Sequence, residues 1–251
     1  MSDYADFRDA AHLPKRRGEQ ALADPNGLPR QRRGTTPQLH GRYPDYDVLE
    51  QAEHWDEVTR KVVLDRVHEV PPIRFFAAHE VPTLKAFCDT ALAQDCEPRI
   101  PVLSYVDEKL YSGNGDGYQY YDMPDDGETW RLVSGGLDEE AQRRGAGAFA
   151  EADEDLRVAI VHDFSHGDLH GGVWDGLNVS RAWSIVMRYC LQAFYAHPWA
   201  WNEIGFGGPA YPRGYARFGS PHLEGGDREE WEAPPAVTTD PVSDVRVRGL
   251  D

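Results

Sequence analysis

The feature that most constrains the fold is an apolar periodicity, in which hydrophobic side chains recur at spacings of three and four. The longest example is the segment SRAWSIVMRYCLQAFYA, which ends shortly before Pro198. Its apolar side chains are Trp183, Val186, Met187, Cys190 and Phe194. This spacing places them on one face of an α-helix, with Asn178 or Ser180 as the N-cap. Pro198 cannot continue that helix, because proline lacks the backbone N–H.

The same period recurs in five further segments: Asp47 to Val70, Ala78 to Gln94, Pro101 to Gly113, Pro124 to Arg144, and Phe149 to Ser165. The first of these predicts a single amphipathic helix whose apolar face includes Val58 and Val62 and which stops at Pro71-Pro72. No run stands out as a β-strand, and no internal repeat is visible. The prediction is an all-α fold: a small irregular helical bundle with a long extended N-terminal arm, an aromatic Gly/Pro-rich loop and an acidic C-terminal tail.

Charge and composition divide the chain into three parts: a basic extended arm (residues 1–45), a helical domain (46–218) and an acidic, proline-rich tail (219–251). Residues 1–42 carry a net charge of +3, and the remainder carries −20. The arm shows no sustained period, so we expect it to be extended or disordered when the chain is alone. The acidic balance, with a pI near 4.9, argues against nucleic acid or an anionic membrane as the main partner.

The cysteines and the N-terminal residues bear on the cellular compartment. Cys88 and Cys190 fall on apolar helical faces and Cys96 at a helix end, which argues against a disulfide or cysteine–metal framework. No segment approaches the roughly 18 apolar residues of a membrane span. Arg16-Arg17 and Arg32-Arg33 are not followed by the apolar stretch of an export signal. We expect a cytoplasmic protein without its own signal peptide, or one exported to the periplasm on a partner's signal.

A histidine cluster, VHDFSHGDLH, is the first candidate site. His162, His166 and His170 are spaced by four, and on a continuous helix the first two would share a face and could chelate a metal ion. Gly167 is expected to end the helix and to turn His170 away. Histidines also suit the negative end of a helix without any ligand. A metal-dependent enzyme is therefore the alternative interpretation.

The segment GNGDGYQYYDMP is a second candidate, for calcium or phosphate. The calcium-loop pattern has no closing acid here, and the glycines do not open a helix as a dinucleotide fingerprint does. We predict a tight, aromatic-lined turn. No nucleophile elbow, zinc-protease motif or Walker sequence occurs, so no catalytic residue is predicted.

The third candidate is HPWAWNEIGFGGPAYPRGY, residues 197–215, which combines aromatic residues with many glycines and prolines. We predict a stiff, non-helical loop. It could plug the bundle with its tryptophan rings, or it could dock on a partner, because rigid aromatic and arginine residues dominate binding hot spots. The residues by themselves favour neither alternative.

This stretch, together with FFAAHEVPTLKAFCDTALAQD and EPRIPVLSYVDEKL, resembles the gluconate 2-dehydrogenase small-subunit (subunit 3) family over about Phe75 to Phe218. The resemblance implies a small helical subunit that associates with a large flavoprotein of the glucose-methanol-choline (GMC) oxidoreductase family. The large subunit would bind FAD and oxidise a sugar, sugar acid or glycoside, and some members also work with a cytochrome c subunit. Many members begin with a twin-arginine leader, whereas this chain has a basic, proline-rich arm.

The resemblance thus implies a non-catalytic accessory subunit that stabilises or matures an FAD-dependent dehydrogenase. No cofactor and no metal is expected in this chain itself. The predicted partner interface is Trp199, Trp201, Asn202, Glu203, Phe206, Tyr211, Arg213 and Tyr215. The alternative remains a stand-alone metal enzyme that uses His162, His166 and His170.

Overall fold

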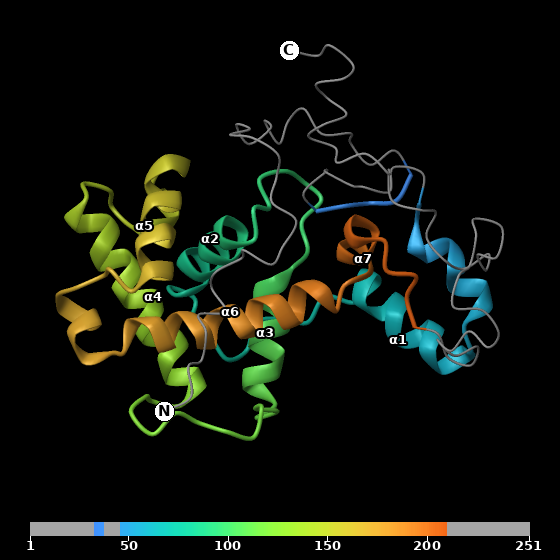
Figure 1. Cartoon of the computed structure of the whole chain (residues 1–251), viewed down its shortest axis with the longest axis horizontal. Helices are drawn as coiled ribbons and strands as arrows, with labels where there is room; N and C mark the ends of the chain where they lie inside the picture. Colours follow the sequence, from blue (N-terminus) through green and yellow to red (C-terminus); the bar gives the residue numbers. More distant parts are fainter. Residues whose placement is uncertain (1–32, 38–45, 210–251) are drawn as a thin grey trace, which may run out of the picture.

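The computed structural model describes residues 33–37 and 46–209, and every regular element in these ranges is helical (Figure 1). The predicted all-α class is therefore confirmed. In chain order the elements are η3 (Val48–His54), α1 (Glu57–His68), α2 (Val81–Ala91), α3 (Val102–Tyr111), α4 (Asp126–Arg143), η4 (Phe149–Glu151), α5 (Glu154–His166), η5 (Gly172–Gly176), α6 (Val179–Tyr195) and α7 (Pro198–Ile204), where η marks a 3-10 helix. None of these described helices combines the length and the apolar character needed to cross a membrane.

Helix α6 is the central element of the bundle, and it packs against α3, α4 and α5 (Figure 1). Asn178 caps it by accepting a hydrogen bond from the Arg181 N–H at 3.2 Å. The residues predicted to face inward divide into a buried set, Val186, Cys190 and Phe194, and a half-buried pair, Trp183 and Met187. The predicted inward face is thus confirmed, and the half-buried pair forms its edge.

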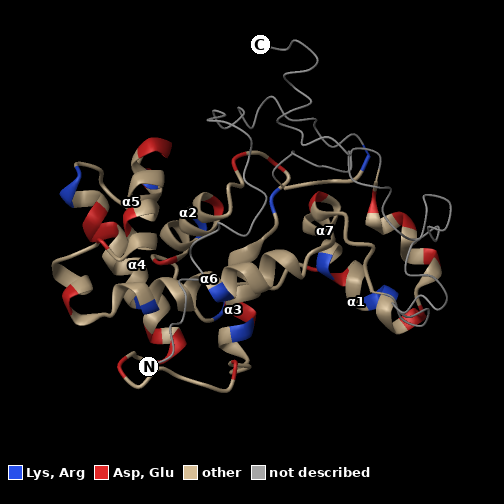
Figure 2. Ribbon diagram, in the orientation of Figure 1, with Lys and Arg blue, Asp and Glu red and all other residues tan. Residues whose placement is uncertain are grey.

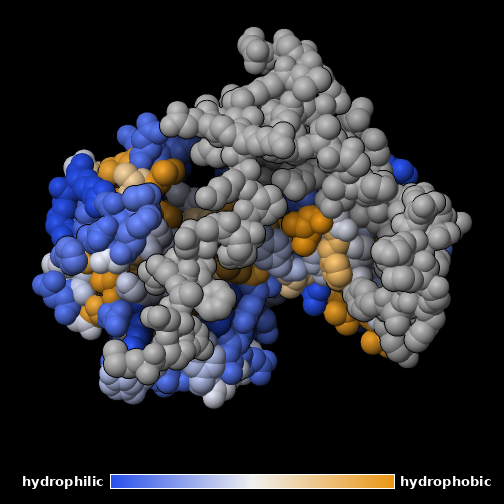
Figure 3. All heavy atoms as spheres, in the orientation of Figure 1, coloured by the Kyte–Doolittle hydropathy of each residue, from blue (hydrophilic) through white to orange (hydrophobic). Residues whose placement is uncertain are grey.

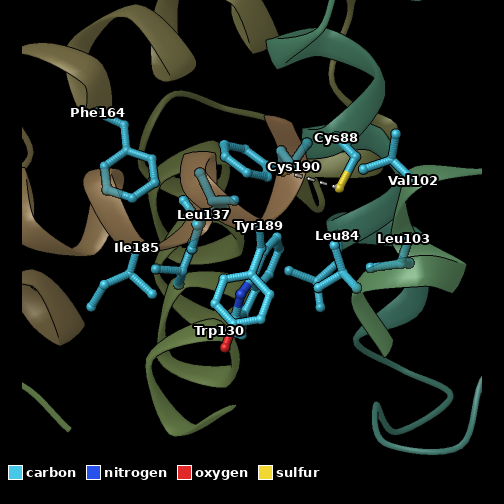
Figure 4. Close-up of a cluster of buried hydrophobic side chains, with 14 of the residues drawn as sticks. Leu84, Cys88, Val102, Leu103, Trp130, Leu137, Phe164, Ile185, Tyr189 and Cys190 are labelled. Carbon is cyan, nitrogen blue, oxygen red and sulfur yellow. Dashed lines mark hydrogen bonds between the residues drawn. The ribbon is translucent and has the colours of Figure 1, made fainter. Parts of the chain in front are cut away.

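The main core lies between α2, α3, α4, α5 and α6 and is rich in aromatic rings (Figure 4). Phe87 and Trp130 are fully buried and meet edge to face, with ring centroids 6.3 Å apart. Cys88 and Cys190 lie in the same core as free thiols whose sulfur atoms are 3.8 Å apart, and Cys96 is exposed. The prediction that Cys88 and Cys190 are core residues is confirmed.

The paired glycines of α4 have different surroundings. A Cβ atom on Gly135 would meet nothing within 4 Å, whereas one on Gly136 would lie 2.6 Å from the Trp174 ring. Trp174 belongs to η5 and is almost fully buried. Gly136 therefore permits the close approach of this ring to the helix backbone, which is a packing role for glycine.

The segment from Asp47 to Val70 differs from its prediction as one helix. It forms η3 and α1, separated at Trp55, because Asp56 caps α1 by accepting a hydrogen bond from the Thr59 N–H at 2.7 Å. Trp55 turns inward at this break, while Val58 and Val62 of the predicted apolar face are exposed. Local capping by aspartate thus prevailed over the apolar periodicity.

A second, smaller core joins η3 and α1 to α7. It contains Tyr46, Val48, Trp55, Val63 and Trp201. In Figure 1 these elements lie together at the end of the molecule beyond the C-terminus of α6. The coloured atoms in Figure 3 are mostly hydrophilic, with hydrophobic patches scattered among them. The fold therefore consists of a main bundle and a satellite cluster centred on α7.

Candidate functional site

The segment that begins at His197 turns sharply after α6 and forms α7, which corrects the prediction that it is non-helical. Pro198 occupies the first helical turn, where a missing N–H has no cost, and Gly205 ends the helix with φ +67°. His197 caps α7 through Nδ1, which accepts a hydrogen bond from the Trp199 N–H at 3.2 Å. The proline that stops one helix here starts the next.

The two tryptophans of α7 pack into different cores. Trp201 is 5% exposed, lies in the satellite cluster, and donates its indole N–H to the Tyr195 carbonyl oxygen at 2.6 Å. Trp199 is half-buried, packs against the main core, and meets the His197 ring with centroids 4.7 Å apart. Both rings therefore act as internal packing groups in this chain.

Asn202 holds the N-terminal residues against α7. Its side chain is fully buried; Oδ1 accepts a hydrogen bond from the Val48 N–H at 2.7 Å, and Nδ2 donates to the Thr35 carbonyl oxygen at 2.9 Å. Gly34 lies so close that a Cβ there would be 2.4 Å from Nδ2. Part of the predicted arm, residues 33–37, is therefore docked on α7, and the rest of the arm lies outside the described residues.

The remaining residues of the predicted interface fall into two groups. Phe206 is half-buried and meets the Trp201 ring edge to face at 5.3 Å, and Glu203 is half-buried and interacts within the chain. Tyr211, Arg213 and Tyr215 lie outside the described residues. The docking role of these residues stays a prediction.

The electrostatics of the α6–α7 corner are dominated by burial. His197 is 1% exposed, and burial lowers its pKa to about 4. Arg66 of α1 lies nearby and donates to the Ala196 carbonyl oxygen at 2.7 Å. His197 is therefore neutral at physiological pH, as its acceptor role at the helix cap requires.

The histidine cluster has the local geometry that the sequence predicts. Gly167 ends α5 in the left-handed conformation, and the rings of His162 and His166 stack with centroids 4.2 Å apart. His162, His166 and His170 are all exposed. Within the described residues, no group of three or more His, Cys, Asp or Glu side chains is arranged to hold a metal ion.

The connection between α3 and α4, residues 112–125, carries a surface that sequence reasoning missed. We call it the tyrosine loop (Figure 1, green, lower edge). Gly113 and Gly117 adopt positive φ, as expected for turns. Tyr118 and Tyr121 are exposed, and Arg188 and Arg181 of α6 lie over their rings. The sequence does contain a signal for this surface. Arg181 and Arg188 are seven residues apart and so share a face of the predicted helix, and the motif YQYYD supplies the tyrosines.

The helical bundle matches a known family model. The family model described as gluconate 2-dehydrogenase subunit 3 matches residues 78–208, slightly more than half of the chain. The matched region includes the main bundle, the tyrosine loop and α7, and it leaves out η3 and α1. Comparison with curated proteins found no match, and comparison with solved structures found none either.

Proposed function

Since the chain belongs to the gluconate 2-dehydrogenase subunit 3 family, we propose that it is the non-catalytic small subunit of an FAD-dependent dehydrogenase acting on a sugar, sugar acid or glycoside. It stabilises or matures a large flavoprotein of the GMC type, which binds the FAD. A cytochrome c subunit is a further partner in this scheme. The observation that carries the proposal is the family match over the helical bundle.

The arrangement of the described residues is consistent with an accessory role. The three histidines of the alternative, metal-dependent interpretation are exposed, and Gly167 turns the chain after the first two. The described residues contain no β-strand, and so no strand–turn–helix unit of the kind that commonly cradles a dinucleotide. Both observations favour placing the redox chemistry on a partner subunit.

The test is co-expression with a candidate large flavoprotein of the GMC type from the same organism, with the large subunit expressed by itself as the control. We expect native mass spectrometry to detect a complex of both chains, and the flavin absorbance per large subunit to be higher than in the control. Stoichiometric zinc or iron, with turnover in the isolated small chain, would support the metal-enzyme alternative and overturn the proposal.

A further inference from the structure

The tyrosine loop carries two aromatic side chains that stay exposed although arginines of α6 lie against their rings. Tyr121 is 94% exposed and Tyr118 is 54% exposed. By contrast, Trp201 and Asn202 of the predicted interface are covered by residues of the same chain. Tyrosine is enriched at the energetic centres of protein interfaces, so this loop has the composition of a docking surface.

Ion pairs hold the loop in place. Lys109 of α3 pairs with Asp116 at 2.6 Å. Arg188 of α6 pairs with Asp116 at 2.6 Å and with Asp126 at 3.2 Å, and it also donates to the Tyr118 hydroxyl at 2.5 Å. These contacts from two helices fix the loop before any partner binds. Little conformational entropy is then lost on association, which favours affinity.

Arg181 braces the far end of the loop in the same way. It forms an ion pair with Asp122, and its guanidinium lies 5.6 Å from the centre of the Tyr121 ring. The positive charges of this surface are thus matched by carboxylates. A partner can cover these arginines without leaving an uncompensated positive charge, which would be costly to bury.

A hollow of about 410 Å³ lies beside Tyr118, between the loop and the start of α4. Its charged lining residues are Lys109, Asp116, Asp125 and Asp126. Asp116 and Asp126 have cationic partners, whereas Asp125 pairs with no described cation. Figure 2 shows acidic residues at this end of α4. The positive N-terminal end of the α4 dipole offsets only about half of the negative charge of Asp125. The hollow therefore favours a cationic side chain.

We propose that the tyrosine loop is the docking surface for the large subunit, and that a lysine or arginine of that subunit enters the hollow beside Asp125. Tyr118 lines this hollow, and Tyr121 contacts the large subunit at the far end of the loop. The inference rests on the proposed function, because it takes the large flavoprotein as the occupant. It differs from the predicted interface, whose residues lie between 199 and 215, in and beyond α7.

The test measures the affinity of full-length variants for the separately purified large flavoprotein. Tyr121→Ala is expected to raise Kd about tenfold or more, as loss of an interface hot spot does. Asp125→Asn keeps the capping oxygen but removes the charge, and it is expected to raise Kd about three- to fivefold and to weaken the salt dependence. The matched controls are Val58→Ala, which is exposed on α1, and Asp153→Asn, which alters the exposed cap of α5.

A change in Kd reports on the interface only if the variant is folded. Each variant is therefore first compared with the parent by thermal melting. Tyr121 is almost wholly in solvent, and its removal should leave the melting temperature unchanged. If Tyr121→Ala and Asp125→Asn bind like the controls, the docking surface lies elsewhere while the proposed function stands. If the parent chain itself does not bind the flavoprotein, the proposed function fails as well.

Discussion

The side chain of Asn202 accepts a hydrogen bond from the backbone N–H of Val48 at 2.7 Å, across 154 residues of sequence. The same side chain donates to the Thr35 carbonyl oxygen and to the Asp47 carboxylate. One fully buried amide therefore ties two N-terminal segments to α7. Those segments lie outside residues 78–208, which the family model matches, so Asn202 connects the matched bundle to residues that precede it.

Replacing Asn202 by Ala should detach these segments. The Val48 N–H and the Thr35 carbonyl would lose their partners, and leaving buried polar groups unsatisfied costs about 1–3 kcal/mol each. We expect a lower free energy of unfolding and faster amide exchange at residues 46–55, with α2 to α6 unaffected. Asn114→Ala, in an exposed turn, is the control. Unchanged exchange at residues 46–55 would contradict this role.

The glycine pair of α4 offers a matched test. Gly135→Ala should stabilise the chain by about 0.5–1 kcal/mol, since alanine is the better helix former and the position is open. Gly136→Ala should destabilise it by about 1–3 kcal/mol, because the new methyl group would overlap the Trp174 ring. Urea unfolding of both variants measures the difference. Equal changes in the free energy of unfolding would show that the Trp174 ring moves aside without a loss of stability.

His197 should make stability depend on pH. Burial lowers its folded-state pKa to about 4, below the 6.5 of an exposed histidine, so the unfolded chain binds the proton more tightly. The contribution of neutral His197 to the free energy of unfolding is complete above pH 6.5 and is lost as the pH falls towards 4. The expected loss between pH 7.5 and 4.5 is about 2.5 kcal/mol.

Carboxylates also titrate in that window, so the measurement is a comparison of urea unfolding between variants. His197→Asn keeps a capping oxygen but cannot titrate, and its loss of stability between the two pH values should be smaller by the same amount. His68→Asn, at an exposed site, should behave like the parent chain. An identical pH dependence for parent and His197→Asn would rule out the neutral buried histidine.

The three thiols should differ in reactivity. Cys96 is exposed, whereas contact with Cys190 and burial raise the pKa of the Cys88 thiol. A thiol reagent should therefore modify one cysteine rapidly in the native chain and the other two only after denaturant is added. Cys96→Ser should abolish the fast phase. Two fast thiols in the native chain would mean that the core opens readily.

Replacing each tryptophan of α7 by Ala tests the two cores one at a time, because Trp199 packs against the main core and Trp201 lies in the satellite cluster. Trp201→Ala should cost about 3–5 kcal/mol, because the indole is buried and its N–H is bonded. Trp199→Ala should cost less, since that ring is only half-buried. Thermal melting gives the order of the two effects, and co-purification with the large subunit reports docking. The reverse order would show that Trp199 is the principal anchor.

Local sequence determined the helices of the main bundle. Apolar spacing and caps such as Asn178 act within one or two turns, so the positions of α2, α3 and α6 followed from neighbouring residues. The turn at Gly167 and the core placement of Cys88 were predictable for the same reason. Where two local signals competed, as at Asp56, periodicity by itself gave the wrong answer.

The tertiary structure alone decided which aromatic residues of the turn-rich segments are buried and which are exposed to solvent. Trp201 and Tyr121 are both aromatic residues in segments with turn-forming neighbours, yet one is 5% and the other 94% exposed. Trp201 is covered by residues 46–63, which are far away along the chain, whereas Tyr121 lies on a loop held outward by Arg181 and Arg188 of α6. Burial is a sum over contacts between distant segments, and a local pattern contains no information about that sum.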